Sequence, residues 1–277
     1  MEKLFLFLFI PLIVTIPLLY RFIKLGKSSW YVKKDALDWN LNYNKVEKIR
    51  LGQTILGYIY FLFHGSFFWG WYNMLIFTGT AFLISLFLEI IGPKIGIFGG
   101  VYKYHDFGIM GIKFMGVPLL IPLIWAGLIY MSLNLCSLIT NYNLLNKTTL
   151  NTFYLISITS FVLVLLDMIL DPIAVDEKRW EWEIPGVFYK VPLMNFVGWF
   201  FTSFIILWIF HFMQTPKSVM TQSKFFVIYS PGILMGILPA IAARPCFERN
   251  LKIPGVIGIV LTIIFGLMII YKYQIIG

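Results

Sequence analysis

Charged side chains are scarce in this sequence. Only 13% of the 277 residues are Asp, Glu, Lys or Arg, whereas a water-soluble domain carries about a quarter. The hydrophobic fraction is 59% and the mean hydropathy is +0.83. This composition excludes an ordinary soluble domain and predicts an all-α, polytopic integral membrane protein. We expect a single transmembrane domain over residues 1–277, located in the cell membrane.

Cysteine and histidine are also scarce. Cys136 lies in an apolar run and Cys246 in an expected short loop; two such residues are too few for a disulfide framework or a metal cluster. The three histidines, His64, His105 and His211, form no close pair. This spacing argues against a di-iron membrane desaturase or hydroxylase, which needs many His ligands. Metal-independent chemistry is therefore expected.

Long apolar runs are abundant, and a helix needs about 20 such residues to cross a bilayer. Eight runs qualify, at approximately 4–23, 52–71, 73–92, 117–137, 151–170, 193–213, 225–243 and 254–272. The boundary near Tyr72 and Asn73 is the weakest, because a single long or re-entrant segment there would change the count. The first run has no small-residue cleavage site, so we interpret it as a retained span.

The basic residues divide unevenly between the two sides that these eight spans define. The side of the 24–51 loop holds Arg21, Lys24, Lys27, Lys33, Lys34, Lys45, Lys48, Arg50, Lys94, Lys103, Lys113, Lys178, Arg179, Lys190, Arg244, Arg249 and Lys252. The other side holds Lys3, Lys147, Lys217, Lys224 and Lys272. Basic residues favour the cytoplasmic side, so both termini are predicted outside. Topology thus accounts for the net charge of +9, and no nucleic-acid partner is needed.

Three acidic residues fall within or at the edge of apolar runs, where ionisable groups are costly and often functional. They are Glu89, Asp167 and Asp171, all expected at similar depth near the cytoplasmic side. Asp167 and Asp171 are four apart and should share one helix face. Pro172 should end or sharply turn that helix. Pairing of such acids with Arg or Lys is the structural alternative to a functional role.

Each acidic segment is followed by a loop and a similar apolar string. VPLLIPLIW occupies residues 117–125 and VPLMNFVGW residues 191–199, with Val-Pro-Leu and Trp in the same register. We infer a parallel internal repeat with units at about 73–137 and 151–213. A site at the interface of the two units is a natural expectation.

Two stretches resemble the membrane-bound carotenoid biosynthesis protein family, whose characterised members are carotenoid 1,2-hydratases acting on gamma-carotene or bisanhydrobacterioruberin. DMILDPIAVDEKRWEWEIPGVFYKVPLMNFVGW, residues 167–199, resembles its Asp, DP, W-x-W, G-V-P and N-F-x-G-W signature. EIIGPKIGIFGGVYKYHDFGIMGIKFMGVPLLIPLIW, residues 89–125, resembles its first motif. Lys190 and Phe188 depart from the family's usual Gly and Tyr, which leaves the substrate open.

The resemblance implies a lyase that adds water to the terminal isoprenoid double bond of an acyclic carotenoid, giving a tertiary alcohol. A carboxylic acid in a low-dielectric site can supply the proton. We assign Asp167 or Asp171 as proton donor, with Glu89 and the remaining Asp orienting water. The expected substrate-binding residues are Tyr102, Tyr104, Trp125, Trp182, Asn195 and Trp199. The partners are membrane lipid, water and a carotenoid or other polyisoprenoid held between the third and sixth spans, and no redox cofactor is required.

Two other functions fit parts of the pattern. Asp167-Met-Ile-Leu-Asp171 has the DxxxD form of intramembrane prenyltransferases that bind magnesium diphosphate, although a second, Asn-Asp-led cluster is missing from the sequence. A small membrane transporter also fits a parallel repeat with intramembrane acids. The acids of a transporter would be expected at the midplane of the membrane, whereas the three acids of this chain are expected near one side of it.

Overall fold

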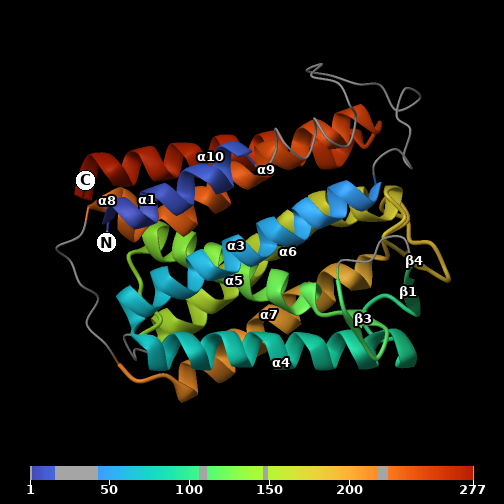
Figure 1. Ribbon diagram of the computed structural model, residues 1–277, viewed down its shortest axis with the longest axis horizontal. Coiled ribbons are helices and arrows are strands. Elements are labelled where there is room, and N and C mark those ends of the chain that lie inside the picture. Colours follow the sequence, from blue (N-terminus) through green and yellow to red (C-terminus); the bar gives the residue numbers. More distant parts are fainter. Residues whose placement is uncertain (1, 16–42, 106–110, 146–148, 217–223, 277) are drawn as a thin grey trace.

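The computed structural model describes residues 2–15, 43–105, 111–145, 149–216 and 224–276, and these form a helix bundle (Figure 1). Its helices are α1 (Glu2–Ile10), α3 (Tyr43–Trp69), α4 (Trp71–Ile95), α5 (Leu120–Thr140), α6 (Thr149–Asp176), α7 (Leu193–Met213), α8 (Phe225–Ile228), α9 (Ser230–Glu248) and α10 (Lys252–Ile276), with a π-helix at Pro11–Thr15. Short strands are β1 (Tyr102–Tyr104), β2 (Lys113–Phe114), β3 (Val117–Pro118) and β4 (Trp180–Trp182).

Six helices are long and apolar enough to cross a membrane: α4, α5, α6, α7, α9 and α10. They correspond to the six predicted runs from 73–92 to 254–272, and the 193–213 run coincides with α7. The predicted 52–71 run covers the second part of α3 and extends two residues past its end at Trp69. The predicted 4–23 run covers most of α1 and the π-helix, and its remainder lies outside the described residues. A polytopic helical protein is thereby supported, while the total of eight spans remains a prediction.

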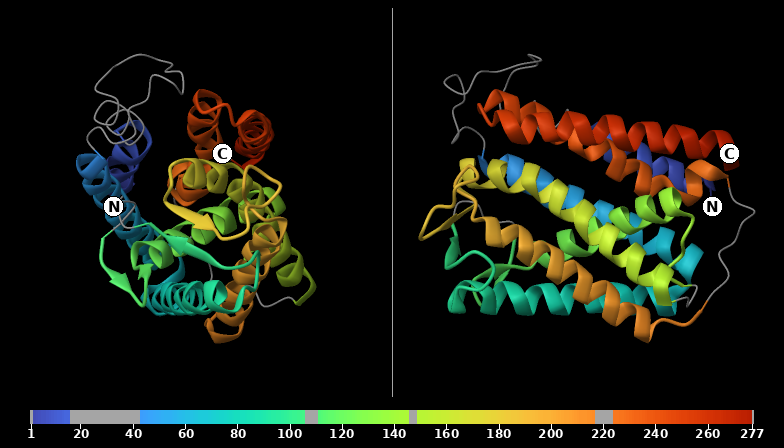
Figure 2. Two further views of the ribbon diagram at one scale, coloured as in Figure 1. Left: turned by 90° about the vertical axis from the view of Figure 1, so that its right-hand side faces the viewer. Right: turned by 180° about the vertical axis from the view of Figure 1, so that it is seen from behind.

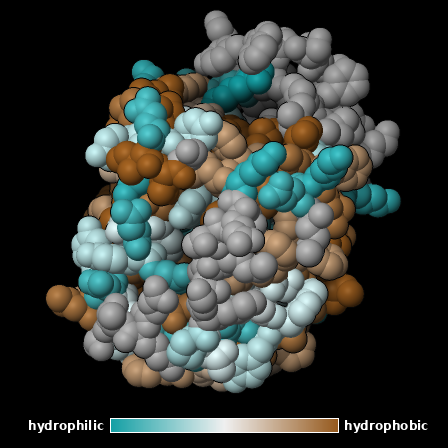
Figure 3. Space-filling model, turned by 90° about the vertical axis from the view of Figure 1, so that its left-hand side faces the viewer, coloured by the Kyte–Doolittle hydropathy of each residue, from teal (hydrophilic) through white to brown (hydrophobic). Residues whose placement is uncertain are grey.

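The lateral surfaces of these helices carry large apolar side chains. Leu83 and Phe87 on α4, Phe161 on α6 and Leu267 on α10 are each more than half exposed. A soluble monomer rarely exposes so much contiguous apolar surface, whereas a bilayer covers it. Hydrophilic and hydrophobic side chains are mixed on the end face where α1 begins and α10 ends (Figure 3).

The uncertain boundary between the second and third runs is a break between two helices. α3 ends at Trp69, α4 begins at Trp71, and Gly70 between them has a φ of 84°. Residues with a side chain rarely adopt this angle, and glycine tolerates it. The chain therefore reverses at Gly70, two to three residues before the predicted position.

Two expectations about helix ends were wrong. Pro172 does not end its helix, because α6 continues to Asp176 and leaves the helical conformation at Lys178, where φ is 53°. A proline removes one backbone donor, and surrounding groups in a membrane helix can compensate for it. Cys246 lies inside α9 and not in a loop, because this helix extends to Glu248 across Pro239 and Pro245.

The helices alternate in direction, so that α4 and α6 end where α5 and α7 begin (Figures 1 and 2). At this end of the bundle β1 and β4 form an antiparallel ribbon that joins the loop after α4 to the loop after α6. Strand alternation places Tyr102, Tyr104, Trp180 and Trp182 on one face of the ribbon. The other face carries Lys103 and Glu181 as an exposed ion pair 3.1 Å apart.

Candidate functional site

All nine residues singled out in the sequence line one cavity of about 420 Å³. These residues are Glu89, Tyr102, Tyr104, Trp125, Asp167, Asp171, Trp182, Asn195 and Trp199. They come from α4, α5, α6, α7 and the β1–β4 ribbon, at the end of the bundle that carries this ribbon. The fold therefore brings together residues that lie up to 110 positions apart in the chain.

Asp167 and Asp171 form a buried pair on α6, with exposed fractions of 0% and 3%. Their spacing of four residues places both on one helix face. The side-chain amide of Asn195 on α7 donates to both carboxyl groups, at 3.0 Å to Asp167 Oδ2 and 2.6 Å to Asp171 Oδ2. The other oxygen of Asp167, Oδ1, has no hydrogen-bond partner among the described residues. One acidic oxygen thus stays available next to the cavity.

Glu89 on α4 has a different set of neighbours. Its Oε2 accepts hydrogen bonds from the hydroxyl groups of Tyr102 and of Tyr104, the latter at 2.7 Å. Its Oε1 accepts from the indole Nε1 of Trp125 at 3.1 Å. Burial, followed by the nearby charge of Glu89, raises the pKa of both tyrosines well above the usual value. Both phenols consequently remain protonated donors.

Aromatic rings line the space between the acidic groups. Trp125 and Trp199, which occupy matching positions in the two similar strings, stack with ring centroids 3.9 Å apart and an interplanar angle of 25°. Trp182 lies 5.7 Å from Tyr102 across the ribbon. Trp182 is 6% exposed, and its Nε1 has no hydrogen-bond partner among the described residues. The stacking agrees with the expected proximity of the two units, while the repeat itself stays a prediction.

The cavity extends beyond the helices that the sequence suggested. α9 contributes Leu238, Ile241 and Ala242 to its wall, and α3 contributes Arg50 and Gln53. The cavity thus extends beyond the third to sixth spans, α4 to α7, between which the substrate was expected, and the position of the substrate stays a prediction. The reason is packing: α9 contacts both α5 and α6 and covers the side of the cavity that these helices leave open. Hydropathy alone carries no signal for such a contact.

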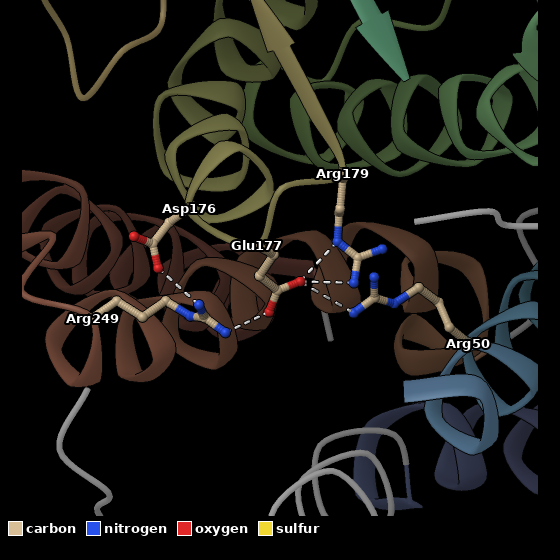
Figure 4. A network of polar contacts seen from close by, with 5 residues as sticks. All are labelled: Arg50, Asp176, Glu177, Arg179 and Arg249. Atoms are coloured by element: carbon tan, nitrogen blue, oxygen red, sulfur yellow. Dashed lines mark hydrogen bonds and ion pairs between the residues drawn. The ribbon is translucent and has the colours of Figure 1, made fainter. Parts of the chain in front are cut away.

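An ionic network at the cavity wall was not anticipated (Figure 4). Arg249 binds Asp176 at 2.9 Å and Glu177 at 2.6 Å. Glu177 also pairs with Arg179 at 2.7 Å and with Arg50 at 3.7 Å. The sequence attributed these arginines to membrane orientation alone. Their only signal was the density of charges in 176–179, since the partners in α3 and after α9 are remote in sequence.

This network joins the segment after α6 to α3 and to the residue after α9. Arg179 and Arg249 are 5% and 4% exposed, and buried arginines need paired acids. The network lies on the same cavity as the Asp167–Asp171 pair. One part of the cavity wall therefore consists of paired charges, separate from Glu89 and the Asp167–Asp171 pair.

Comparisons with known proteins agree with these features. The family described as carotenoid biosynthesis protein matches residues 49–265, which include every residue of the candidate site. The chain is also similar to a bisanhydrobacterioruberin hydratase from Haloarcula japonica, at 31% identity over 131 residues. This alignment covers 47% of the chain and 42% of the relative, so the chain matches less than half of that protein's length. No solved structure matches. The chain belongs to the carotenoid biosynthesis protein family.

Proposed function

We propose that this protein hydrates the terminal isoprenoid double bond of an acyclic carotenoid end group, giving a tertiary alcohol. The observation that carries the proposal is the buried Asp167–Asp171 pair beside a cavity that is lined in part by aliphatic and aromatic side chains. A carboxyl pair in such surroundings can hold a proton and deliver it to an alkene. The similarity to a hydratase supports the same chemistry.

The reaction needs one proton and one water molecule. The π electrons of the double bond take a proton from the Asp167–Asp171 pair at the less substituted carbon, which leaves a tertiary cation. The oxygen of water then bonds to the cation, and the excess proton passes to a carboxylate. The sum is alkene plus water to alcohol, so the protein ends in its starting protonation state.

The different environments of the acids suggest different roles. Asp167 and Asp171 receive hydrogen bonds from the same amide donor, Asn195. Their remaining oxygens can hold one proton for the pair. Glu89 lies on another helix and accepts hydrogen bonds from two phenols and one indole. We therefore assign the aspartate pair as the acid and Glu89 as the group that orients water. This keeps the proton donor and the proton acceptor on separate helices.

The aromatic residues are assigned to the cation and the polyene. The face of a Trp or Tyr ring stabilises a nearby cation by about 2 kcal/mol when both are desolvated. Trp125, Trp182, Trp199 and Tyr102 present such rings to the cavity. The cavity of about 420 Å³ accommodates an end group, and the rest of the polyene would extend between helices toward lipid.

The direct test is expression in cells that accumulate lycopene, with pigment mass measured for a gain of one water. Asp167→Asn and Glu89→Gln should each reduce the hydrated pigment at least about 100-fold, because a positioned acid or base contributes about 10²–10⁴-fold. Glu183→Gln is the matched control, since Glu183 is an exposed acid after β4 that does not line the cavity. Wild-type levels of hydrated pigment in both cavity variants would refute the assignment.

A further inference from the structure

A second, smaller cavity lies behind Glu89. Its volume is about 40 Å³, and it is bordered by α4, α5, α7 and the loop after α4. Five side chains border both cavities: Glu89, Tyr102, Trp125, Asn195 and Trp199. These side chains form a partition, with the Asp167–Asp171 pair bordering only the large cavity.

The small cavity suits water and not an isoprenoid. A water molecule needs about 10–15 Å³ of such space and two to four polar partners, so about three molecules fit. The residues that border it include four with polar side chains, Ser85, Glu89, Asn195 and Thr202. The volume is about a tenth of that of the large cavity, which excludes a branched carotenoid end group.

Glycine keeps this space open. A Cβ atom at Gly92 would meet only Ile97 Cγ1, at 4.0 Å. The position therefore borders free volume rather than a packed neighbour. Gly92 lies three residues after Glu89 on α4, so both face the same side of the helix. A methyl group at this position would take up space beside the carboxylate.

We propose that the small cavity is the binding site for the substrate water, an inference that rests on the hydration proposed above. Water held behind the partition reaches the cation past Glu89, which accepts its proton as the new C–O bond forms. The aspartate pair has already given a proton to carbon from the other side. The cycle closes when the proton on Glu89 returns to the aspartate pair through water, so none is consumed overall.

Separate cavities have a chemical purpose in this scheme. Bulk water in the large cavity would compete with the alkene for the acidic proton and would raise the local dielectric constant. Confining the reacting water behind Glu89 keeps it away from the acid pair, whose interactions are stronger where water is scarce. The partition also directs water to one face of the cation.

The test compares Gly92→Ala with Gly79→Ala in purified protein with lycopene in D₂O. Gly79 is on the same helix, lines neither cavity and has open space around its Cβ position. The Gly92→Ala protein should hydrate lycopene at least about tenfold more slowly. The added methyl group would displace the water that Glu89 deprotonates, and a positioned base contributes about 10²–10⁴-fold to the rate. Cations that water does not capture lose a proton and return to alkene. Recovered lycopene should therefore contain more deuterium than with Gly79→Ala.

Thr202→Val provides a second variant, since it removes one hydroxyl from the small cavity at nearly constant volume. It should change the ratio of hydration to deuterium exchange in the same direction. If wild-type protein hydrates lycopene and both variants match Gly79→Ala in rate and exchange, the water site is refuted while the hydratase stands. Loss of hydration and exchange together would also refute it, because protonation itself would then have failed. No hydration and no exchange by the wild-type protein would refute the proposed function instead.

Discussion

Two buried polar clusters lie toward opposite ends of the same bundle and differ in what surrounds them. One contains Asp167, Asp171 and Asn195, where the β1–β4 ribbon closes the bundle. The other contains His64 and Tyr130, near the end of α3 and the start of α9. Both are costly in an apolar protein, since every polar group must find a partner.

The histidine cluster is internally complete. His64 is fully buried, its Nδ1 pairs with the Tyr130 hydroxyl at 2.6 Å, and its Nε2 pairs with the Val227 carbonyl at 2.8 Å. Tyr60 and Ser230 share a further hydrogen bond beside it. None of these residues lines either of the two cavities. This cluster joins α3, α5, α8 and α9 and leaves neither ring nitrogen of His64 for a ligand.

In the acidic cluster, by contrast, two polar atoms lack hydrogen-bond partners. Asp167 Oδ1 and Trp182 Nε1 have no hydrogen-bond partner among the described residues, and both side chains line the large cavity. Buried polar atoms without partners are rare and costly, and these two adjoin the cavity of the proposed site. The comparison shows that burial of polar groups alone does not identify a site. The adjoining cavity and the unpartnered atoms distinguish the acidic cluster from the histidine cluster.

Among substitutions in the two clusters, Asp171→Asn should have the largest effect on hydration. Hydration should fall about 10³-fold, because the amide cannot donate an acidic proton to carbon. The thermal midpoint in detergent should stay equal or rise, since a neutral group replaces a buried acid. Hydrated pigment and thermal unfolding measured on one preparation check both statements. A large loss of thermal stability would mean that the pair is structural.

His64→Phe should have the opposite effect. The free energy of unfolding should fall by about 2–4 kcal/mol, because the Tyr130 hydroxyl and the Val227 carbonyl each lose a buried partner worth about 1–3 kcal/mol. The hydration rate per folded molecule should stay within about threefold of wild type. Denaturant unfolding in detergent and pigment assays measure the two quantities. Loss of activity without loss of stability would place His64 in the reaction.

Trp125→Phe should have the smallest effect of the three. It removes one of the three donors to Glu89 while keeping an aromatic ring against Trp199. A hydrogen bond to a charged group contributes about 1.5–3 kcal/mol, so a fall of about tenfold in hydration rate is expected. Trp208→Phe is the control, because Trp208 stacks on Phe204 and lines neither cavity. Equal rates in both variants would show that the indole donor is unimportant.

Much of the candidate site followed from local sequence features. An acid within an apolar run is conspicuous because its burial is costly, and this directed attention to Glu89, Asp167 and Asp171. The four-residue spacing then correctly placed the two aspartates on one face. By contrast, Arg249 and Glu177 are ordinary loop charges in sequence. Their pairing depends on how the ends of α6 and α9 meet, which no local pattern encodes.

For the fold, too, some features followed from local sequence and others depended on the three-dimensional structure. Hydrophobic length alone located six helices that are long and apolar enough to cross a membrane. The expectations at Pro172 and Cys246 were wrong, because α6 and α9 continue through prolines. The break at Gly70 was placed approximately from polarity, and its position depends on a backbone angle that glycine accepts.

By itself, the sequence determined the class of protein, the membrane helices and the acids, because the bilayer penalises polar groups one residue at a time. Tertiary structure alone decided that Glu89 and the aspartate pair border one cavity, that α9 closes it, and that a smaller polar cavity lies behind Glu89. These features depend on packing between helices remote in the chain. Their energies arise from shape and contact, which composition and periodicity do not record.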